Sequence, residues 1–261
     1  MKVRENISFS VKDNVRDINP VELLSRIKSA IRFPEKVIKS ERRKSTLRVN
    51  IPPWGDLCLQ IYKRDLKRTV LSPFRLSKRE RIWNLSGNLL KNVIPVPEPI
   101  LFLEIKKSIF TIETYIAYRW IDGGVNLGML ALDRGIFHNE DFKYILCRCV
   151  DIVIKLHNSG FVHGDLKWSN FLYVDGENSR VILIDTDSLK KSSSPNLQGK
   201  DLARFILSAI EYQLNPELRE VLIYRYIKGR KPSNTLIEKS IRRRIAKKIT
   251  KYEGRVIQSG K

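Results

Sequence analysis

The sequence predicts an α+β fold in which a small lobe built on an antiparallel sheet precedes a mainly helical lobe. Residues 46–62 contain two alternating hydrophobic patterns around a turn, which predict a β-hairpin in the first part. In residues 141–157 the apolar positions follow the 3.6-residue period of a helix with one buried face. Between these patterns, Asp122-Gly123-Gly124 marks the joint of the two lobes.

Three segments follow from this joint. Residues 1–35 are predicted to form an N-terminal helical extension, 36–121 the sheet-rich N-lobe, and 122–261 the C-lobe with basic helices at its end. The chain has 261 residues, a length that fits one compact unit or a small two-lobed one, because a single hydrophobic core stops growing at around this size. Hydrophobic residues make up 42% of the chain, enough to bury a core, which excludes wholesale disorder.

The elements of the first two segments are predicted from caps, alternation and prolines. Asn19 before Pro20 is a helix start, and Pro34 sets its end. Three prolines between residues 95 and 99 stop a second helix, since proline cannot donate a backbone hydrogen bond. The expected elements are a helix from Pro20 to before Pro34, strands at 46–51 and 57–62, a helix at 77–91, and strands at 100–104 and 109–117.

The C-lobe begins with the most regular helical pattern of the chain. Asn158-Ser159-Gly160 ends this pattern with a residue pair and a glycine suited to a helix C-terminus. The turn at 175–178 then separates two short apolar segments, which are predicted to be strands. The expected elements are a helix at 141–157, strands at 171–174 and 180–184, and helices at about 201–213, 217–227 and 235–252.

The charge of the chain predicts an anionic partner. The formal net charge is +21, and it is concentrated in residues 23–49 (+7), 62–81 (+6) and 225–261 (+11). Such clusters attract nucleotide phosphates, nucleic acid or an anionic membrane surface. RNA binding stays open as an alternative, although the sequence contains no aromatic-rich RNA-binding signature.

The last basic segment also carries an apolar stripe with a spacing of four residues. The favoured interpretation is that the stripe packs on its own domain, and peripheral contact with the inner face of the cell membrane is the alternative. The stripe consists of Ile237, Ile241, Ile245 and Ile249.

The cysteines and the hydropathy pattern indicate a reducing compartment. Cys58, Cys147 and Cys149 are an odd set without zinc-ligand spacing, and they provide no disulfide framework. No segment approaches the ~18 uncharged residues that a membrane-spanning helix requires. We therefore expect a cytoplasmic protein that crosses no membrane.

The residues that suggest chemistry lie between the long helix of the C-lobe and the next strand, and at the end of the strand after it. Asp165 is followed five residues later by Asn170, and Asp185 ends an apolar strand. Phosphoryl transfer requires a carboxylate that orients the attacking hydroxyl and oxygen ligands for magnesium. Asp165 fits the first role, Asn170 and Asp185 fit the second, and Lys167 is placed to neutralise the moving phosphoryl group.

This arrangement resembles the protein-kinase-like superfamily, whose catalytic loop reads His-Arg-Asp-Leu-x-x-x-Asn. Within the superfamily, the chain is most similar to bacterial lipopolysaccharide kinases, which phosphorylate Kdo or heptose sugars of the inner core. The likeness covers most of residues 36–230. It is carried by Leu156-His157-Asn158-Ser159-Gly160-Phe161-Val162-His163-Gly164-Asp165-Leu166-Lys167, by Ile184-Asp185-Thr186-Asp187, by Asp201-Leu202-Ala203-Arg204-Phe205, and by Arg81-Ile82-Trp83-Asn84 with Ile94-Pro95-Val96-Pro97-Glu98-Pro99.

The resemblance implies a two-lobed kinase fold, ATP and Mg²⁺ as cofactors, and an anionic glycolipid or sugar as acceptor. It implies that Asp165 is the catalytic base, that Lys167 contacts phosphate, and that Asn170 and Asp185 bind the metal. His163 is expected to be a satisfied interior histidine that braces the loop. For Asp201 two roles stay open: it holds the catalytic loop through backbone hydrogen bonds, or it caps the next helix.

The N-lobe departs from the kinase pattern where the nucleotide is gripped. The first hairpin has no Gly-x-Gly-x-x-Gly, and Gln60 takes the position of the nucleotide-gripping lysine, with Cys58 on the same strand face. Lys63 points to the other face of a regular strand. Three alternatives follow: a bulge recruits Lys63, the basic run at 63–68 meets the phosphates instead, or the activity is weak. Glu80 is the nearby candidate for the acid of the helix.

Acceptor class is predicted from what the C-lobe lacks. Gly164 replaces the arginine that reads activation-loop phosphorylation, and the short segment between Asp185 and Asp201 has no Ala-Pro-Glu anchor, which disfavours a protein substrate. A sugar hydroxyl of the lipopolysaccharide inner core is the leading expectation. The alternatives are a pseudokinase or scaffold without transfer activity, and a protein or small-molecule kinase of the aminoglycoside type.

Overall fold

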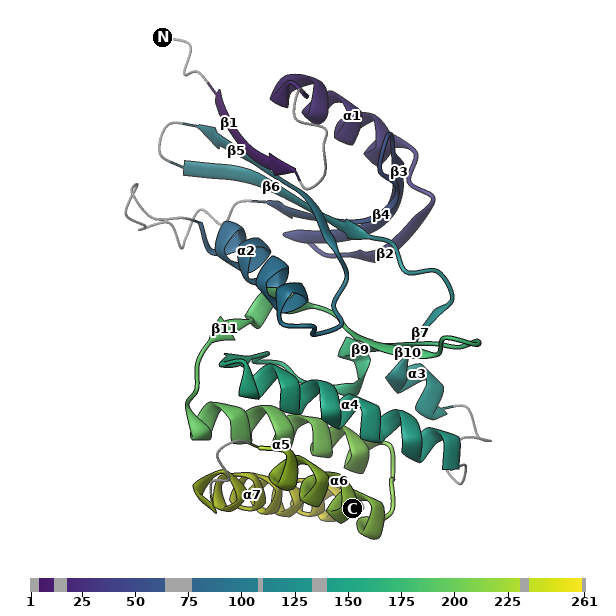
Figure 1. Cartoon of the computed structure of the whole chain (residues 1–261), viewed down its shortest axis with the longest axis vertical. Helices are drawn as coiled ribbons and strands as arrows, with labels where there is room; N and C mark the ends of the chain where they lie inside the picture. Colours follow the sequence, from purple (N-terminus) through teal and green to yellow (C-terminus); the bar gives the residue numbers. More distant parts are fainter. Residues whose placement is uncertain are drawn as a thin grey trace. The chain divides into compact units, whose positions relative to one another are not determined.

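The computed structural model describes residues 5–11, 18–63, 77–107, 110–132, 140–230 and 235–259 (Figure 1). It comprises two compact units. The first contains residues 1–88 and 97–121, and the second contains residues 89–96 and 122–261. The mixed composition of the two units, with an antiparallel sheet in the first and mainly helices in the second, confirms the predicted fold class.

The first unit is built on a six-stranded antiparallel sheet with the strand order β1-β5-β6-β4-β3-β2. Both predicted strand pairs are present as β3–β4 and β5–β6. Residues 5–11, which the sequence analysis assigns to no strand, pair with β5 at the sheet edge. The elements are β1 (Glu5–Val11), α1 (Pro20–Arg32), β2 (Lys36–Ser40), β3 (Lys44–Ile51), β4 (Gly55–Lys63), α2 (Lys78–Lys91), β5 (Pro99–Lys107) and β6 (Phe110–Arg119).

Alternation along the strands divides the core of this unit between the two faces of the sheet. Leu23 and Ile27 of α1 belong to the same buried cluster as Leu57 and Leu59 of β4. On the other face, Trp83 of α2 packs against a smaller cluster of Tyr62, Phe102, Ile116 and Tyr118. Because side chains alternate along a strand, Cys58, Gln60 and Tyr62 share the face of the smaller cluster.

The second unit is mainly helical, with short strands that hold its loops in place. Its strands form a three-stranded sheet of order β10-β9-β7 and a two-stranded sheet of β11 and β8. The elements are β7 (Gly124–Asn126), α3 (Leu127–Leu132), α4 (Glu140–Asn158), β8 (Phe161–Val162), η2 (Trp168–Asn170), β9 (Phe171–Val174), β10 (Arg180–Leu183), η3 (Thr186–Ser188), β11 (Lys190–Lys191), α5 (Pro195–Glu211), α6 (Pro216–Gly229) and α7 (Thr235–Ser259).

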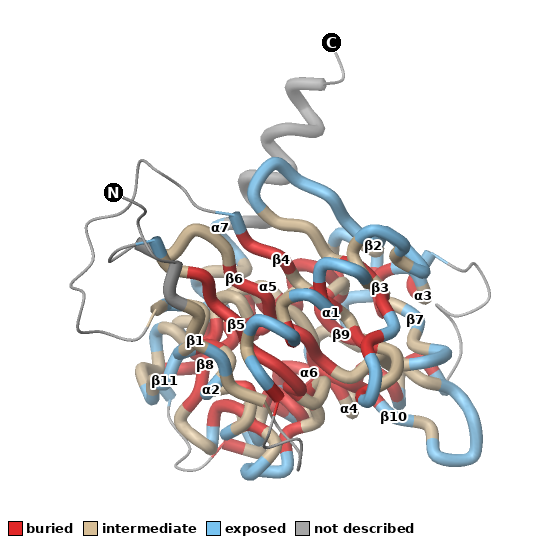
Figure 2. Tube along the Cα trace, turned by 90° about the horizontal axis from the view of Figure 1, so that it is seen from above, coloured by how far each residue is buried: buried red, intermediate tan, exposed pale blue. Residues whose placement is uncertain are grey.

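Helix α5 is buried along much of its length (Figure 2). It begins at Pro195, earlier than the predicted start at 201, because Ser194 is the N-cap and proline suits the first helical position. Trp168 of η2 is fully buried, with its ring stacked on Tyr212 at a centroid distance of 5.4 Å and tilted against Phe205 at 6.0 Å. This aromatic packing fixes the segment that follows the loop between β8 and η2.

Helix α7 buries part of its apolar stripe within its own unit. Ile237 and Ile241 are 3% and 0% exposed, which confirms for these two residues the interpretation that the stripe packs on its own domain. The side chain of Ile249 lies outside the described residues. The basic side of the helix includes Arg242, which bonds to Glu220 and Glu238. Among the described helices, none combines the length and the hydropathy that a membrane span needs.

Candidate active site

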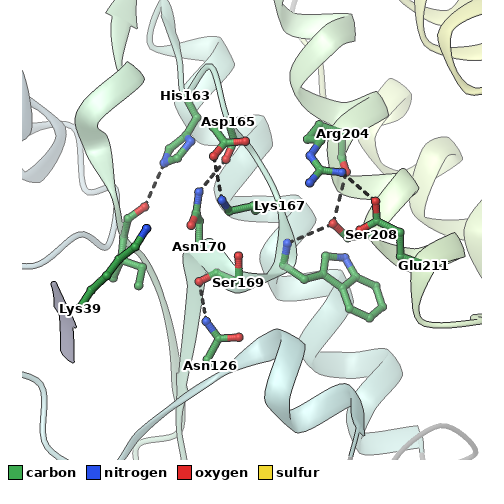
Figure 3. Close-up of polar contacts among 12 residues, drawn as sticks. Lys39, Asn126, His163, Asp165, Lys167, Ser169, Asn170, Arg204, Ser208 and Glu211 are labelled. Carbon is green, nitrogen blue, oxygen red and sulfur yellow. Dashed lines mark hydrogen bonds and ion pairs between the residues drawn. The ribbon is translucent and has the colours of Figure 1, made fainter. Parts of the chain in front are cut away.

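The loop between β8 and η2 carries Asp165 and Lys167, and η2 ends with Asn170 (Figure 3). The carboxylate of Asp165 is 42% exposed and lies 3.0 Å from Nζ of Lys167, whose side chain is 34% exposed. Partial burial raises the pKa of Asp165, but the hydrogen bond from Lys167 and the positive charges of Lys167 and Arg204 lower it further, so the net shift is downward. Asp165 is therefore an ionised, accessible carboxylate at neutral pH.

Asn170 is directed by the loop itself. Its side chain is almost fully buried, at 3% exposure, and its amide nitrogen donates to the backbone carbonyl of Asp165 at 2.7 Å. This bond occupies the donor end of the amide, so the oxygen is the end that can bind a cation. The two residues, five positions apart in the chain, are thus held together.

Asp185 lies two residues after the end of β10, and the intervening Ile184 is tied to the same loop. The backbone N–H of Ile184 donates to the carbonyl of Asn170 at 2.8 Å. Nε2 of the buried His163 lies 3.0 Å from the carbonyl of Ile184, a contact in which the ring N–H donates. His163 is therefore an interior histidine that braces the loop, as predicted. The prediction that it is satisfied holds for Nε2 alone, because Nδ1 is buried and has no hydrogen-bond partner among the described residues. Asp185 itself adopts a left-handed backbone, with φ of 58°, which turns the chain into η3.

Asp201 of α5 fixes the backbone of the loop from beneath. Its carboxylate is 2% exposed and accepts the N–H of His163 at 2.6 Å and the N–H of Gly164 at 2.9 Å. Because α5 begins at Pro195, Asp201 lies inside the helix and does not cap it. Of the two roles left open by the sequence, the structure places Asp201 in the first, as the acceptor for the loop backbone.

His157, for which the sequence predicts no partner, has two partners in the structure. This histidine is 1% exposed, and its Nε2 lies 3.3 Å from the Asp201 carboxylate while its Nδ1 lies 2.7 Å from the hydroxyl of Tyr226. Burial lowers the pKa of His157 although Asp201 favours the charged form, so the ring is neutral at pH 7. The geometry fits a tautomer in which Nε2–H donates to Asp201 and Nδ1 accepts from Tyr226.

Arg230, directly after α6, extends this buried network. The residue is 8% exposed, and its guanidinium donates to Oε1 of Gln198 at 2.8 Å and to Oδ1 of Asn158. The ends of α4 and α6 are thereby joined to α5. No motif in the sequence signalled Arg230, because its partners come from positions far away along the chain.

Gly164 is required by the way the loop approaches η3. Its φ is +86°, a conformation that L-residues rarely adopt, and a Cβ built there would lie 2.7 Å from the carbonyl oxygen of Ser188. Gly164 takes the position that an arginine occupies in many protein kinases. The close approach of the Ser188 backbone explains why this residue is a glycine. A side chain of any size would displace the loop or η3.

We expect Gly164→Ala to lower the free energy of unfolding by more than the ~1–2 kcal/mol that a left-handed backbone costs an L-residue, because the contact with Ser188 adds to that cost. Gly123→Ala is the matched control, since φ of Gly123 is +66° and its Cβ would meet nothing within 4 Å. Chemical denaturation measures both variants. Equal losses of stability would contradict the steric argument.

The candidate nucleotide-gripping position lies in the first unit. Oε1 of Gln60 accepts a hydrogen bond from the Tyr62 hydroxyl at 2.6 Å, and the guanidinium of Arg79 lies 3.7 Å from the centroid of the Tyr62 ring. Burial raises the pKa of Cys58, on the same strand face, to about 11, so this thiol is protonated and unreactive at neutral pH. Gln60 is thus adjacent on this face to Tyr62, and the guanidinium of Arg79 stacks on the Tyr62 ring.

Lys63 is exposed at the end of β4, on the strand face opposite to Gln60, as a regular strand requires. Strand β4 pairs with β6 without a register shift, so no bulge brings Lys63 to the face of Gln60. Glu80 lies in the first turn of α2, where its backbone N–H bonds to the Ser77 hydroxyl. Residues 64–68 of the basic run, and His138, lie outside the described residues.

The second unit thus gathers the predicted site residues of the loop and of the strand end. Among the described residues, no group of three His, Cys, Asp or Glu side chains forms a metal cluster. The predicted ligands do not require one, because they combine the carboxylate of Asp185 with the amide oxygen of Asn170. Hard oxygen donors of this kind, completed by water and phosphate, fit Mg²⁺.

A sheet-rich unit and a helical unit that carries this loop together define a kinase. Two solved structures share the fold. The structure titled WaaP in complex with acyl carrier protein has a TM-score of 0.65 and 16% identity and covers 91% of this chain and 98% of its own. The kinase domain of PknI from Mycobacterium tuberculosis, solved as a double mutant, has a TM-score of 0.51 and 15% identity, with coverage of 81% and 94%.

The chain belongs to the lipopolysaccharide kinase (Kdo/WaaP) family, whose sequence pattern matches residues 56–226. The match includes β4 from Asp56 onward and every predicted site residue.

Short stretches also match curated protein kinases. A CDPK-related kinase 8 of Arabidopsis thaliana is 35% identical over 74 residues, and a calcium/calmodulin-dependent protein kinase type 1B of Rattus norvegicus is 28% identical over 85 residues. These alignments span 28% and 33% of this chain, but only 12% and 24% of the relatives. They support the kinase fold of the aligned part and leave the acceptor undefined.

Proposed function

We propose that the chain transfers the γ-phosphoryl group of ATP, with Mg²⁺, to a hydroxyl of a Kdo or heptose sugar in the lipopolysaccharide inner core. One observation carries the proposal: the accessible, ionised carboxylate of Asp165 lies on a loop whose backbone bonds to the buried Asp201. Family membership supports the acceptor class. Phosphoryl transfer depends mainly on positioning and charge, which a fixed loop supplies.

In this proposal Asp165 accepts a hydrogen bond from the sugar hydroxyl and orients the oxygen toward the γ-phosphorus. Its lowered pKa keeps it in the acceptor form at neutral pH. Lys167 moves from its ion pair with Asp165 to the phosphoryl oxygens, where it offsets the charge that develops in transfer. The proton of the hydroxyl passes to Asp165 as the new oxygen–phosphorus bond forms, while the bond between the γ-phosphorus and the bridging oxygen of ATP breaks and ADP leaves.

Asn170 and Asp185 would hold Mg²⁺ through oxygen atoms. When bound, the cation would supply positive charge that offsets the negative charge of the nucleotide phosphates. The chain contributes the orientation of these ligands: Asn170 is held by its bond to the Asp165 carbonyl, and the strand before Asp185 is held by Asn170 and His163.

The proposed acceptor is anionic and carried by a lipid, so we also propose peripheral contact with the inner face of the cell membrane. Exposed basic residues of α7, among them Arg243 and Lys247, support this part of the proposal. Basic residues near an anionic leaflet contribute about 1 kcal/mol each. A cytoplasmic location agrees with the use of ATP.

The proposed function is tested with purified protein, labelled ATP and Mg²⁺, offered deacylated core oligosaccharide, intact lipopolysaccharide, an aminoglycoside or casein. We expect label on the first two acceptors. Label on the aminoglycoside or on casein alone would contradict the proposed acceptor class but support the kinase activity. Absence of label on every acceptor would overturn the proposed transfer.

A pseudokinase is the second candidate, and Gln60 is the observation that favours it. Gln60 carries no charge for a nucleotide phosphate, and its Oε1 accepts a hydrogen bond from Tyr62. Thermal unfolding with ATP, with and without Mg²⁺, separates the two candidates when it is combined with the transfer assay. Stabilisation by ATP that depends on Mg²⁺, without transfer to any acceptor, would favour the pseudokinase.

Because Lys167 forms an ion pair with Asp165, we expect the pH dependence of kcat/KM to change when Lys167 is replaced. Because the pKa of Asp165 is lowered, its carboxylate stays ionised until the pH falls through that lowered value, and kcat/KM declines only below it. Lys167→Met removes the strongest influence that lowers the pKa, so the acidic limb moves to higher pH and the maximum rate falls. Lys200→Met, an exposed change on α5, is the control, and it should leave the limb in place. An unmoved limb in Lys167→Met would contradict the assignment of that limb to Asp165.

A further inference from the structure

A concave surface lies beside α4, and its lining does not include the loop that carries Asp165. It is a groove of about 860 Å³ between α4, the start of β10, the end of α6 and Pro95. None of the predicted site residues lines it. Its volume lies in the range of binding pockets, and the proposed function makes no use of it.

Positive charge dominates the lining of this groove. The cations are Lys143, Arg148, Lys155, Arg180 and Arg225, against one acid, Asp151. That acid is already engaged, because its two oxygens accept bonds from Nε and a terminal nitrogen of Arg225, each at 2.7 Å. The groove therefore presents an excess of positive charge to whatever enters it.

Between the cations, the groove presents apolar side chains. Ile152, Ile154 and Val181 line it together with Cys147. Ile154 is fixed in place by the close approach of α6: a Cβ on Gly229 would lie 2.5 Å from Ile154 Cδ1. An apolar floor with a cationic rim is typical of a protein interface and differs from a simple solvated face.

The spacing of the cations argues against a small anion. Lys143 and Lys155 are twelve positions apart on one helix, which corresponds to about 18 Å at 1.5 Å per residue. One phosphate or carboxylate cannot contact charges spread over this length. A flat membrane surface would meet the rim but would not reach the apolar floor of a hollow.

The arginines of the groove also favour a ligand with several carboxylates, such as a polypeptide segment with successive acidic side chains. A guanidinium binds a carboxylate through two parallel bonds, as Arg225 already does with Asp151. Arg148 is held at the rim by Tyr144, whose hydroxyl accepts its bond at 2.9 Å and whose ring lies 5.6 Å from its guanidinium. Arginine and tyrosine are enriched among residues that dominate binding at interfaces.

From the length, the charge and the apolar floor together, we propose that this groove docks an acidic segment of a partner protein, with apolar residues interspersed among its carboxylates. The carboxylates bind the cations of the rim, and the apolar side chains cover the partly buried Ile154. Docking there is separate from phosphoryl transfer, so the site binds a partner without entering the reaction.

The test uses the full chain and a fluorescein-labelled peptide composed of Glu and Leu. Fluorescence anisotropy measures the binding of the peptide at low and at raised salt concentration. The triple variant Arg148→Glu, Lys155→Glu and Arg180→Glu should weaken binding by about tenfold or more. The matched control, Lys239→Glu, Arg243→Glu and Lys247→Glu on α7, reverses the same number of charges and should change affinity by less than about twofold. Transfer activity of the groove variant should equal that of the wild type.

If charge reversal prevents folding, the triple change to Gln replaces it and should still weaken the peptide. Three outcomes would overturn the proposal: no binding of the Glu/Leu peptide by the wild type, equal losses in the two charge-reversal variants, or retained affinity in the groove variants. Vesicles of phosphatidylserine and phosphatidylcholine form a further arm. The groove would be assigned to a membrane if the wild type bound the vesicles but not the peptide, and if the groove variant no longer bound the vesicles.

Discussion

Asp165→Asn lowers kcat by about 100- to 10,000-fold and leaves the fold intact, if Asp165 is the base of the reaction. Asparagine has nearly the same shape as aspartate, but it is neutral and cannot accept the proton of the sugar hydroxyl. The native side chain is 42% exposed, so its replacement creates no buried cavity. Steady-state kinetics with labelled ATP measures the loss, and thermal unfolding checks the fold.

Asp175→Asn is the matched control for this change. Asp175 lies in the turn between β9 and β10, where its carboxylate accepts bonds from Gly176 N–H and the Tyr173 hydroxyl. The control removes the same charge from the same unit and should leave kcat within about twofold, since surface substitutions away from special features have small effects. Turnover of Asp165→Asn at the level of this control would remove Asp165 from the reaction.

Asp201→Ala should have the largest effect on stability, because it removes the acceptor of two backbone N–H groups and of His157 at once. The groups left behind are buried, and an unsatisfied buried polar group costs about 1–3 kcal/mol. We expect the free energy of unfolding to fall by about 3–5 kcal/mol. The loop also loses its anchor, and a displacement of about 1 Å at Asp165 would lower kcat by about 100-fold.

Tyr226→Phe is the graded comparison for Asp201→Ala. It removes one hydroxyl from His157 and leaves both bonds between Asp201 and the loop backbone in place. The free energy of unfolding of Tyr226→Phe should fall by about 1 kcal/mol, the net value of one ordinary hydrogen bond. The kcat of this variant should stay close to the wild-type value. If Asp201→Ala costs no more stability than Tyr226→Phe in urea denaturation, Asp201 is not the anchor of the loop.

The fold class could be predicted because its signals are local. The strands β3 and β4 are visible as alternation around a Pro-Pro-Trp-Gly turn, and α4 as a single apolar stripe over its length. The loop from His163 to Asn170 was found by residue types at fixed spacing, which survive in a sequence without any structure. The kinase family followed from these residues, and the match over 56–226 confirms it.

The sequence did not reveal features that depend on distant partners. Strand β1 has too little pattern of its own and exists through its pairing with β5. His157 gains its importance from Asp201 and Tyr226, which lie 44 and 69 positions away. The cationic groove is spread over α4, β10 and α6, so no window of the sequence displays it.

By itself, then, the sequence determined the fold class, the residues at the loop and the family, because each of these depends on patterns in neighbouring positions. Only the tertiary structure decided whether Asp201 caps a helix or holds the loop, and why residue 164 must be a glycine. Both answers depend on contacts between α5, η3 and the loop. Such contacts depend on how separate elements pack, and packing is set by the whole chain and not by local spacing.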